Sequence, residues 1–291
     1  MPIKVENASK RSGNQWLFRD VSFEVADGEI FGIFGPNGSG KQSLLASLSG
    51  ETDNSSILSR LFRKGPVGFA ERYTENLDRL EKLSGPIYLD NPFAGLDRQN
   101  RETLAARLKR SATENRSPVI FTSADFEDVL LVCDRAALIA DGYIRQIGTP
   151  QLLYREPCDR LTASFTGPNN LFEARRLTSS KSELPEFQTI AGEHRLFTQK
   201  TGLRGLGAIN KNATLAVRPE QVVLSFGASF PEDNLLKCVI TDIRFRGPAT
   251  YVTLDCSGLE LEAMVTRLIG LNIGDESMVG LPPDRIRILA D

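Results

Sequence analysis

The stretch Gly35–Leu45, GPNGSGKQSLL, limits the possible folds of this 291-residue chain more than any other feature. A short apolar run, EIFGIFG, leads directly into it, and leucines at helical spacing (Leu44, Leu45 and Leu48) follow it. A strand, a glycine-rich loop and a helix in this order are typical of a phosphate-binding loop. Its backbone N–H groups and the positive end of its helix surround phosphate oxygens. We therefore predict a phosphate-binding domain around this loop.

One position in the loop departs from the usual pattern. The lysine, Lys41, is in place to reach the terminal phosphates, but the next residue is Gln42 where a Ser or Thr hydroxyl should bind Mg²⁺. Ser43 does not replace that hydroxyl, because one helical step turns a side chain by about 100°. An amide oxygen can bind Mg²⁺ only from a longer arm and in altered geometry. The predicted nucleotide-binding residues are Gly35, Pro36, Asn37, Gly38, Ser39, Gly40, Lys41, Gln42 and Ser43.

Strand and helix patterns alternate after the loop. An apolar strand, PIYLD, ends at Asp90, where a carboxylate at the edge of the sheet would lie near Mg²⁺. The later patterns predict a helix, a strand, a helix and a hairpin in turn, at residues 98–115, 117–123, 125–134 and 135–148. With two strands at the N-terminus, this order predicts an α/β domain with a mostly parallel sheet and antiparallel N-terminal strands.

Beyond about residue 165 the pattern changes. Short alternating runs such as ATLAVRP, LLKCVITDIRF, ATYVTLDC and LELEAMV are broken by Gly and Pro. Such runs predict a small all-β domain or barrel. We therefore expect two domains, at residues 1–165 and 166–291.

Composition excludes several classes of protein. The net charge of −2 argues against a chain that coats nucleic acid. Four scattered cysteines, without C-x-x-C spacing, argue against a zinc site or a disulfide framework and suit a reducing cytoplasm. The N-terminus lacks the apolar core of a signal peptide, and no run reaches the roughly 18 apolar residues of a membrane span. Contact with a membrane would therefore require a partner.

Six stretches carry a resemblance to a known family. The first three, DVSFEVADGEIFGIFGPNGSGK, YLDNPFAGLD and CDRAALIADGYIRQIGTPQLLYREP, resemble the ATP-binding subunit of an ABC transporter. The other three, LAVRPEQVVL, ITDIRFRGPATYVTL and GLPPDRIRILAD, resemble the C-terminal TOBE domain of import ATPases for polyamines, ferric iron, sulfate, molybdate or sugars. The resemblance implies ATP and Mg²⁺ as cofactors. It also implies membrane permease subunits and a second ATP-binding subunit as partners, at the inner face of the cell membrane.

Three functional positions of that family are matched. Lys41 stands at the phosphate position, Asp90 at the Mg²⁺ position and Asp97 at the aspartate of the subunit interface. We expect only weak metal binding at Asp90, because the hydroxyl that should accompany it is missing.

The other functional positions are not matched. Asn91 stands at the position of the general base and cannot accept a proton. Ser123 stands at the position of the switch histidine, and the single histidine of the chain, His194, lies in the second domain. Ser12 falls where the family has an aromatic side chain that stacks on adenine. Trp16 or Phe18 could lean in there, although packing in the core or at the surface is the expected role of both. The resemblance therefore leaves no catalytic residue intact.

The segment between the two phosphate-site motifs is short. Asp90 follows Lys41 by 49 residues, whereas the family uses more than twice that length for a helical subdomain with an LSGGQ signature. KLSGP at Lys82–Pro86 offers at most a vestige of that signature, and Glu71 lies near the expected glutamine loop.

Three interpretations remain open from the sequence. The first, which we favour, is a degenerate ATP-binding subunit with weak or absent hydrolysis that serves as a partner or regulatory subunit. The second is an active ATPase that energises solute import. The third is a binding or scaffold protein that retains the fold without a role in transport. Two arginine motifs in the second domain, RFRG at Arg244–Gly247 and Arg218, are expected to be structural more than ligand-binding.

Overall fold

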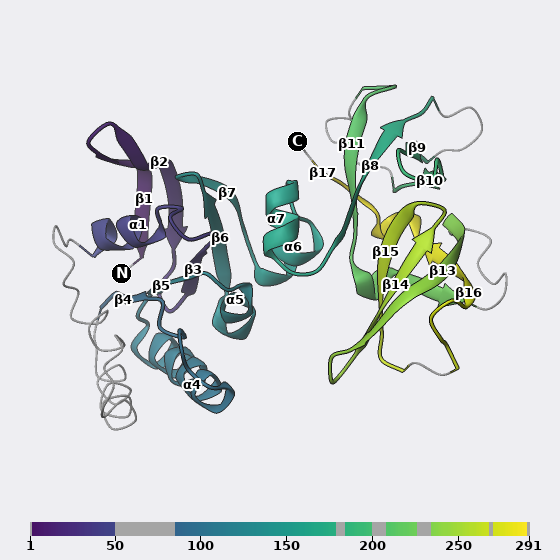
Figure 1. Ribbon diagram of the computed structural model, residues 1–291. Coiled ribbons are helices and arrows are strands. Elements are labelled where there is room, and N and C mark those ends of the chain that lie inside the picture. Colours follow the sequence, from purple (N-terminus) through teal and green to yellow (C-terminus); the bar gives the residue numbers. More distant parts are fainter. Residues whose placement is uncertain are drawn as a thin grey trace. The chain divides into compact units, whose positions relative to one another are not determined.

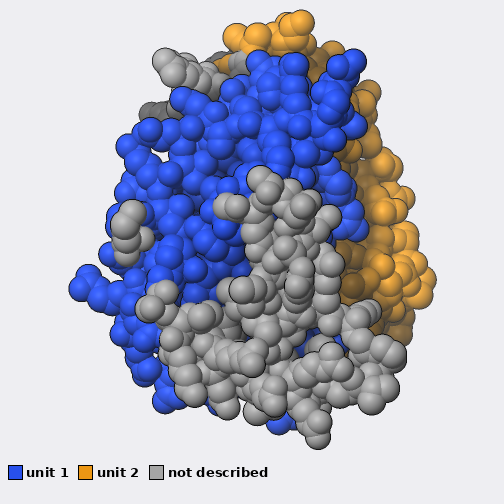
Figure 2. All heavy atoms as spheres, turned by 90° about the vertical axis from the view of Figure 1, so that its left-hand side faces the viewer, with its two compact units in different colours: residues 1–155 blue, residues 156–291 orange. Residues whose placement is uncertain are grey.

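The computed structural model describes residues 2–49, 85–178, 184–199, 208–225, 234–267 and 270–289. Lys82 to Ser84 of the signature vestige, and Glu71, lie outside these residues. The chain divides into two compact units, Met1–Arg155 and Glu156–Asp291, coloured separately in Figure 2. The division falls ten residues before the expected boundary at residue 165.

The first unit is built around a five-stranded sheet in the order β4-β5-β3-β6-β7 (Figure 1). Four of its strands are parallel and β7 is antiparallel to β6. Separately, β1 and β2 form an antiparallel pair. The strands are β1 Ile3–Ser12, β2 Gln15–Val25, β3 Ile30–Phe34, β4 Ile87–Asp90, β5 Val119–Ser123, β6 Arg135–Ala140 and β7 Tyr143–Gly148. The predicted α/β fold is confirmed.

Both faces of this sheet are covered. Successive side chains of β3 point to opposite faces, and all five of its residues are buried. Phe31 and Ile33 face a cluster that includes Phe18 of β2 and Leu44 of the first helix. Ile30 faces the opposite cluster, which contains Leu104 of α4. The helices of the unit are α1 Lys41–Leu48, α4 Arg98–Asn115, α5 Phe126–Val132 and α6 Pro150–Arg155. The phosphate-loop candidate therefore joins a fully buried strand to a helix, which fixes its position.

The second unit is a small β domain around one hydrophobic cluster. It has two five-stranded antiparallel sheets, in the orders β10-β9-β8-β11-β17 and β12-β16-β13-β14-β15. The strands are β8 Asn170–Arg176, β9 Glu186–Thr189, β10 Arg195–Phe197, β11 Asn212–Val217, β12 Val223–Ser225, β13 Asn234–Phe245, β14 Thr250–Cys256, β15 Leu259–Val265, β16 Glu276–Leu281 and β17 Arg287–Leu289. The short helices are α7 Arg160–Phe165, η1 Pro219–Gln221 and η2 Pro283–Arg285. The predicted all-β domain is confirmed.

Helix α7 explains the position of the division between the units. Its Ala163 packs against Ala216 and Leu289 of the β domain. The guanidinium of Arg218, which is 4% exposed, donates to the carbonyls of Gly167 and Pro168 at 3.0 and 2.9 Å. The sequence predicts Arg218 to be a structural ion-pair residue, and these hydrogen bonds go to backbone carbonyls of the segment after α7. The contacts of α7 attach it to the second unit.

One expectation about the cysteines is wrong. Val239 of β13 lies opposite Asp255 of β14, and this register places Cys238 directly across from Cys256. The two sulfur atoms form a disulfide. The spacing of 18 residues carries no motif, so only the long-range pairing of the strands reveals the bond.

Candidate functional site

The loop Gly35–Gly40 lies tightly against two strands, and its glycines make this possible. A Cβ atom at Gly35 would lie 2.1 Å from the carbonyl oxygen of Ile139 in β6, and one at Gly40 would lie 2.1 Å from that of Leu17 in β2. Both glycines also have positive φ, 146° and 97°. Side chains at these positions would force the backbone apart, so the shape of the loop depends on these two glycines.

Helix α1 begins at Lys41 with an open N-terminus. Its N-cap residue, Gly40, provides no side-chain hydrogen bond. The first N–H groups of a helix have no partner within the helix, and the helix dipole adds partial positive charge there. The start of α1 can therefore donate to an anion.

Lys41 is held by the loop that precedes it. Its Nζ donates to the carbonyl oxygens of Gly35 and Pro36, each at 2.7 Å, and the residue is 8% exposed. Burial lowers the pKa of Lys41, and the charge of Asp90 opposes that shift. An ammonium has three N–H donors. The two carbonyls leave one of them to contact a phosphate oxygen.

A cavity of about 440 Å³ brings most of the predicted residues together. Within the described part of the chain, hydroxyls, amides and backbone groups dominate its lining. The lining residues are Leu17, Asn37, Gly38, Ser39, Gly40, Lys41, Gln42, Ser43, Asp90, Asn91, Thr122, Ser123 and Ala124. Ser39 is 5% exposed, and its buried hydroxyl has no hydrogen-bond partner among the described residues. A ligand with several oxygen acceptors would suit this lining.

The residues at the Mg²⁺ position do not fit the ion. The side-chain amide of Gln42 donates from Nε2 to Oδ2 of Asp90 at 3.0 Å. The hydroxyl of Thr122 donates to Oδ1 of the same carboxylate at 2.6 Å. Both oxygens of Asp90 therefore already accept a hydrogen bond, and an N–H group lies where the pattern needs an oxygen ligand. The described residues contain no group of three or more His, Cys, Asp or Glu side chains that could hold a metal.

Asn91, at the position of the general base, is held by its backbone. Its N–H lies 3.1 Å from the carbonyl oxygen of Thr122 and 3.0 Å from the Thr122 hydroxyl, and its φ is 50°. The side chain is exposed at the cavity, but an amide cannot take a proton from water. The cavity therefore has no base at this position.

Ser123, at the position of the switch histidine, belongs to a buried polar network. Its hydroxyl donates to Oδ2 of Asp128 at 2.5 Å and accepts from the N–H of Asp125 at 2.9 Å. Arg101 of α4 donates to the other carboxylate oxygen of Asp128, also at 2.5 Å. Burial raises the pKa of Asp128. Sequence reasoning missed Asp128 and Arg101, because only the packing of α4 on α5 brings them to Ser123.

Asp97 has a local structural role. It is the N-cap residue of α4, and its carboxylate accepts from the N–H of Asn100 at 2.8 Å. It does not line the cavity. Its place at a subunit interface remains a prediction.

The aromatic residues near the loop are engaged elsewhere. Ser12 ends β1 opposite Gln15, and Phe18 is 1% exposed in the core, as expected of a packing residue. Trp16 is 37% exposed, and the guanidinium of Arg11 lies over its ring, 3.7 Å from the centroid.

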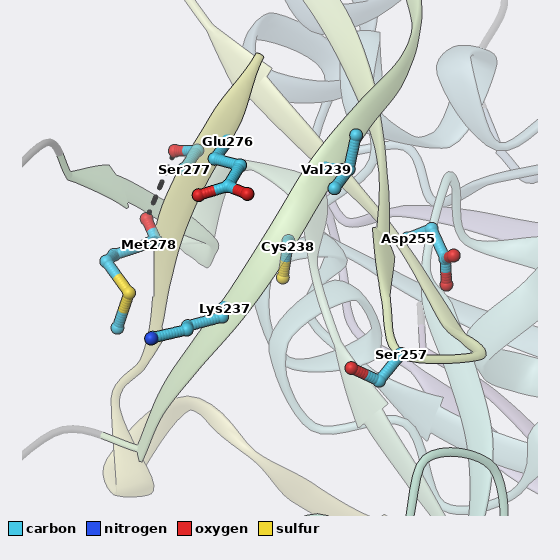
Figure 3. A pocket seen from close by; sticks show the side chains of 8 residues that line it. All are labelled: Lys237, Cys238, Val239, Asp255, Ser257, Glu276, Ser277 and Met278. Atoms are coloured by element: carbon cyan, nitrogen blue, oxygen red, sulfur yellow. Dashed lines mark hydrogen bonds between the residues drawn. The ribbon is translucent and has the colours of Figure 1, made fainter. Parts of the chain in front are cut away.

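A second cavity, of about 530 Å³, lies on β13, β14 and β16 of the β domain. Figure 3 shows Lys237 directed toward Met278, while Asp255 and Glu276 lie on opposite sides of Val239. One ammonium and two carboxylates do not favour an oxyanion. The RFRG turn does not offer an anion site either, because Arg244 pairs with Asp242 and Glu262 and Arg246 lies over the ring of Tyr251. The described part of the chain contains no helix both long and apolar enough to cross a membrane.

Comparison with known proteins connects this site to a family. The family model described as ABC transporter matches residues 18–82, and the model described as TOBE domain matches residues 215–289. The chain is 23% identical to the Fe(3+) ions import ATP-binding protein FbpC of Escherichia coli O157:H7, covering 99% of this chain and 98% of that protein.

Two further relatives have related names. The Sulfate/thiosulfate import ATP-binding protein CysA of Bacillus cereus is 24% identical, over 99% of this chain and 98% of that protein. The Spermidine/putrescine import ATP-binding protein PotA of Ruegeria pomeroyi is 33% identical over 165 residues, which are 57% of this chain and 42% of that protein. The two matched domains and these relatives agree. The chain therefore carries matches to an ABC transporter domain and a C-terminal TOBE domain, and it is similar over nearly its whole length to import ATP-binding proteins.

Proposed function

We propose that this ATP-binding subunit is a degenerate member of its family, which holds nucleotide with little or no hydrolysis and serves as a partner or regulatory subunit. The observation that carries the proposal is the hydrogen bond from Gln42 to Asp90. It places an N–H donor on the carboxylate that would serve the metal. Lys41 and the start of α1 still offer donors to phosphate, so binding and catalysis are separated at this site.

The residues at the two positions that would activate water also support a site with little or no hydrolysis. Loss of a positioned base lowers the rate about 10²–10⁴-fold, and Asn91 cannot be that base. The hydroxyl of Ser123 is committed to Asp128 and Asp125. The two losses act in the same direction, although their effects are not additive.

The length of the chain also supports the proposal of a degenerate subunit. The alignment with the Escherichia coli relative spans 358 positions, against 291 residues in this chain, so at least 67 of those positions have no residue here. This deficit supports the prediction that the segment between Lys41 and Asp90 has lost most of the helical subdomain. That subdomain carries the signature that completes the site of the opposite subunit in the family that the chain resembles.

The partners follow from the family. We infer that the chain works beside membrane permease subunits and a second ATP-binding subunit, in the cytoplasm at the inner face of the membrane. The relatives are named for iron, for spermidine and putrescine, and for sulfate, and these names do not converge on one solute.

Phosphate release by the purified full-length chain tests the proposal. With ATP and Mg²⁺ we expect a rate equal to that of the Lys41→Ala variant, which lacks the phosphate-binding ammonium. A rate well above that of the variant would instead establish an active ATPase. Failure of ATP to bind at all would favour a scaffold that has kept only the fold.

A further inference from the structure

We infer that the cavity at the loop Gly35–Gly40 recognises the polyphosphate chain of a nucleotide and is indifferent to the base, so that inorganic tripolyphosphate binds about as well as ATP. The inference deepens the proposed function and rests on it for the statement that the cavity takes nucleotide. It names the chemical class of the ligand as a metal-free polyphosphate.

The cavity presents mostly polar groups to a ligand. Its described lining contains the hydroxyls of Ser39, Ser43 and Thr122, the amides of Asn37 and Gln42, and the ammonium of Lys41. No described lining residue has an aromatic side chain, and Leu17 is the only one with a large aliphatic side chain. Such donors suit phosphate oxygens. A purine ring needs an apolar or aromatic face, which this lining does not provide.

Two aromatic side chains, Trp16 and Phe18, flank Leu17 in β2. Phe18 is 1% exposed and packs in the core with Val21 and Leu44. Trp16 has the guanidinium of Arg11 over its ring at 3.7 Å from the centroid, and that of Arg19 at 5.4 Å. A base could stack on Trp16 only by displacing cation–π contacts that already stabilise the ring. Neither side chain is therefore free to hold a base.

Ser39 lines the cavity and is 5% exposed, and its buried hydroxyl lacks a hydrogen-bond partner among the described residues. A buried hydroxyl without a partner is unfavourable, and a phosphate oxygen would satisfy it. This independent observation points to an oxygen-rich anion in the cavity.

Gln42 and Thr122 donate to both oxygens of Asp90, so the polyphosphate would enter without Mg²⁺. Gln42 lines the cavity, and the second N–H of its amide can donate to the phosphate chain while the first stays on Asp90. Binding should therefore persist when divalent metal is removed.

Direct binding measurements on the full-length chain with excess EDTA test the inference, with ATP, GTP and inorganic tripolyphosphate as ligands. Stacking of a base on an aromatic side chain is worth about 5- to 150-fold in affinity. We expect the three dissociation constants to agree within about threefold, which is less than any such stack would produce. Lys41→Ala should abolish binding of all three, and the matched control Trp16→Ala should leave all three unchanged.

Two results would overturn the inference in different ways. If ATP binds more than about tenfold tighter than GTP and tripolyphosphate, and Trp16→Ala removes the difference, the site recognises the base. Only this inference then fails. If none of the three ligands binds to a chain whose circular dichroism shows that it is folded, the proposal that the site holds nucleotide fails with it.

Discussion

A single side chain, Gln42, changes what the carboxylate of Asp90 can do. A serine or threonine hydroxyl at this position would place an oxygen beside a cation, whereas the longer amide reaches Asp90 and donates a hydrogen bond to it at 3.0 Å. Thr122 occupies the other oxygen. Both oxygens of the carboxylate thus accept hydrogen bonds from neighbouring side chains, and we propose that the metal requirement of the site depends on residue 42.

Replacing Gln42 by serine should therefore make nucleotide binding depend on Mg²⁺. The restored hydroxyl and the released Asp90 oxygen together offer the ion two oxygen contacts. We expect Mg²⁺ to strengthen ATP binding by about tenfold in Gln42→Ser and by much less in the natural chain. Titration calorimetry with and without Mg²⁺ measures this. A Mg²⁺ enhancement that persists in the double variant Gln42→Ser/Asp90→Ala would show that the metal lies elsewhere.

The buried carboxylate of Asp128 predicts a pH-dependent stability. Burial, the largest cause, raises its pKa above the ordinary value of 3.8 in the folded state. The folded state then holds the proton more tightly than the unfolded state, so this contribution is fully present below pH 3.8 and is lost as the pH rises through the raised pKa. Above that pKa, Asp128 stabilises the fold only through its bonds to Ser123 and Arg101.

The variant Asp128→Asn tests this expectation by urea denaturation between pH 4 and pH 7. It should lower the free energy of unfolding by about 1–3 kcal/mol, because the network loses an acceptor. The difference from the natural chain should shrink as the pH rises. Glu127→Gln, on the exposed side of the same helical turn, is the matched control and should change little. A difference that grows with pH would show that the pKa of Asp128 is lowered instead.

At the scale of the elements, α4 shows one residue with two possible roles. Asp97 begins the helix as its N-cap, and it is also the residue that the resemblance assigns to a subunit interface. Asparagine caps a helix about as well as aspartate, whereas alanine does not. The two roles can therefore be separated by two substitutions at one position.

We expect Asp97→Ala to lower the free energy of unfolding by about 0.5–2 kcal/mol and Asp97→Asn to leave it nearly unchanged. Thermal or chemical denaturation of the purified variants measures both. If Asp97→Asn is as unstable as Asp97→Ala, the charge rather than the cap stabilises this part of the fold. If both variants match the natural chain, the cap contributes nothing measurable.

The elements of both units could be predicted because their signals are local. The apolar run before Gly35, the leucine spacing in α1 and the alternation of the hairpin at residues 135–148 each lie within a few residues. The contacts that decide the chemistry are not local. Cys238 meets Cys256 only through the register of β13 and β14, and Asp128 meets Arg101 only through the packing of α5 against α4.

The boundary between the units also depends on a non-local contact that local sequence patterns do not reveal. The sequence pattern places α7 at the end of the first domain, because the helix follows an α/β pattern. Its attachment is decided by Arg218, which lies 52 residues beyond Thr166 and donates to its hydroxyl at 2.7 Å. Periodicity within the helix carries no information about such a partner.

At the scale of the whole molecule, we expect the phosphate site to need residues of a second subunit for hydrolysis. In the family that this chain resembles, the signature of a second subunit completes each site, and such positioning contributes a large part of catalysis. Residues on one chain can then be repaired without restoring the reaction.

The triple variant Gln42→Ser, Asn91→Glu and Ser123→His should therefore bind Mg²⁺ and ATP more tightly while its turnover stays at background. Phosphate release is measured for the variant alone and then mixed with an intact relative that can supply a signature. Robust turnover by the triple variant alone would contradict the proposal that loss of the helical segment is the deciding defect.

The most direct test of the central claim, that the site holds nucleotide without hydrolysing it, is to recover the nucleotide after binding. An excess of the full-length chain is incubated with labelled ATP and Mg²⁺, the complex is isolated, and the nucleotide is separated by chromatography over several hours. We predict that the label is recovered as intact ATP, at the same rate of decay as in the solution without protein, and that Lys41→Ala retains none of it. Steady conversion of bound ATP to ADP by the natural chain, absent in Lys41→Ala, would contradict the account.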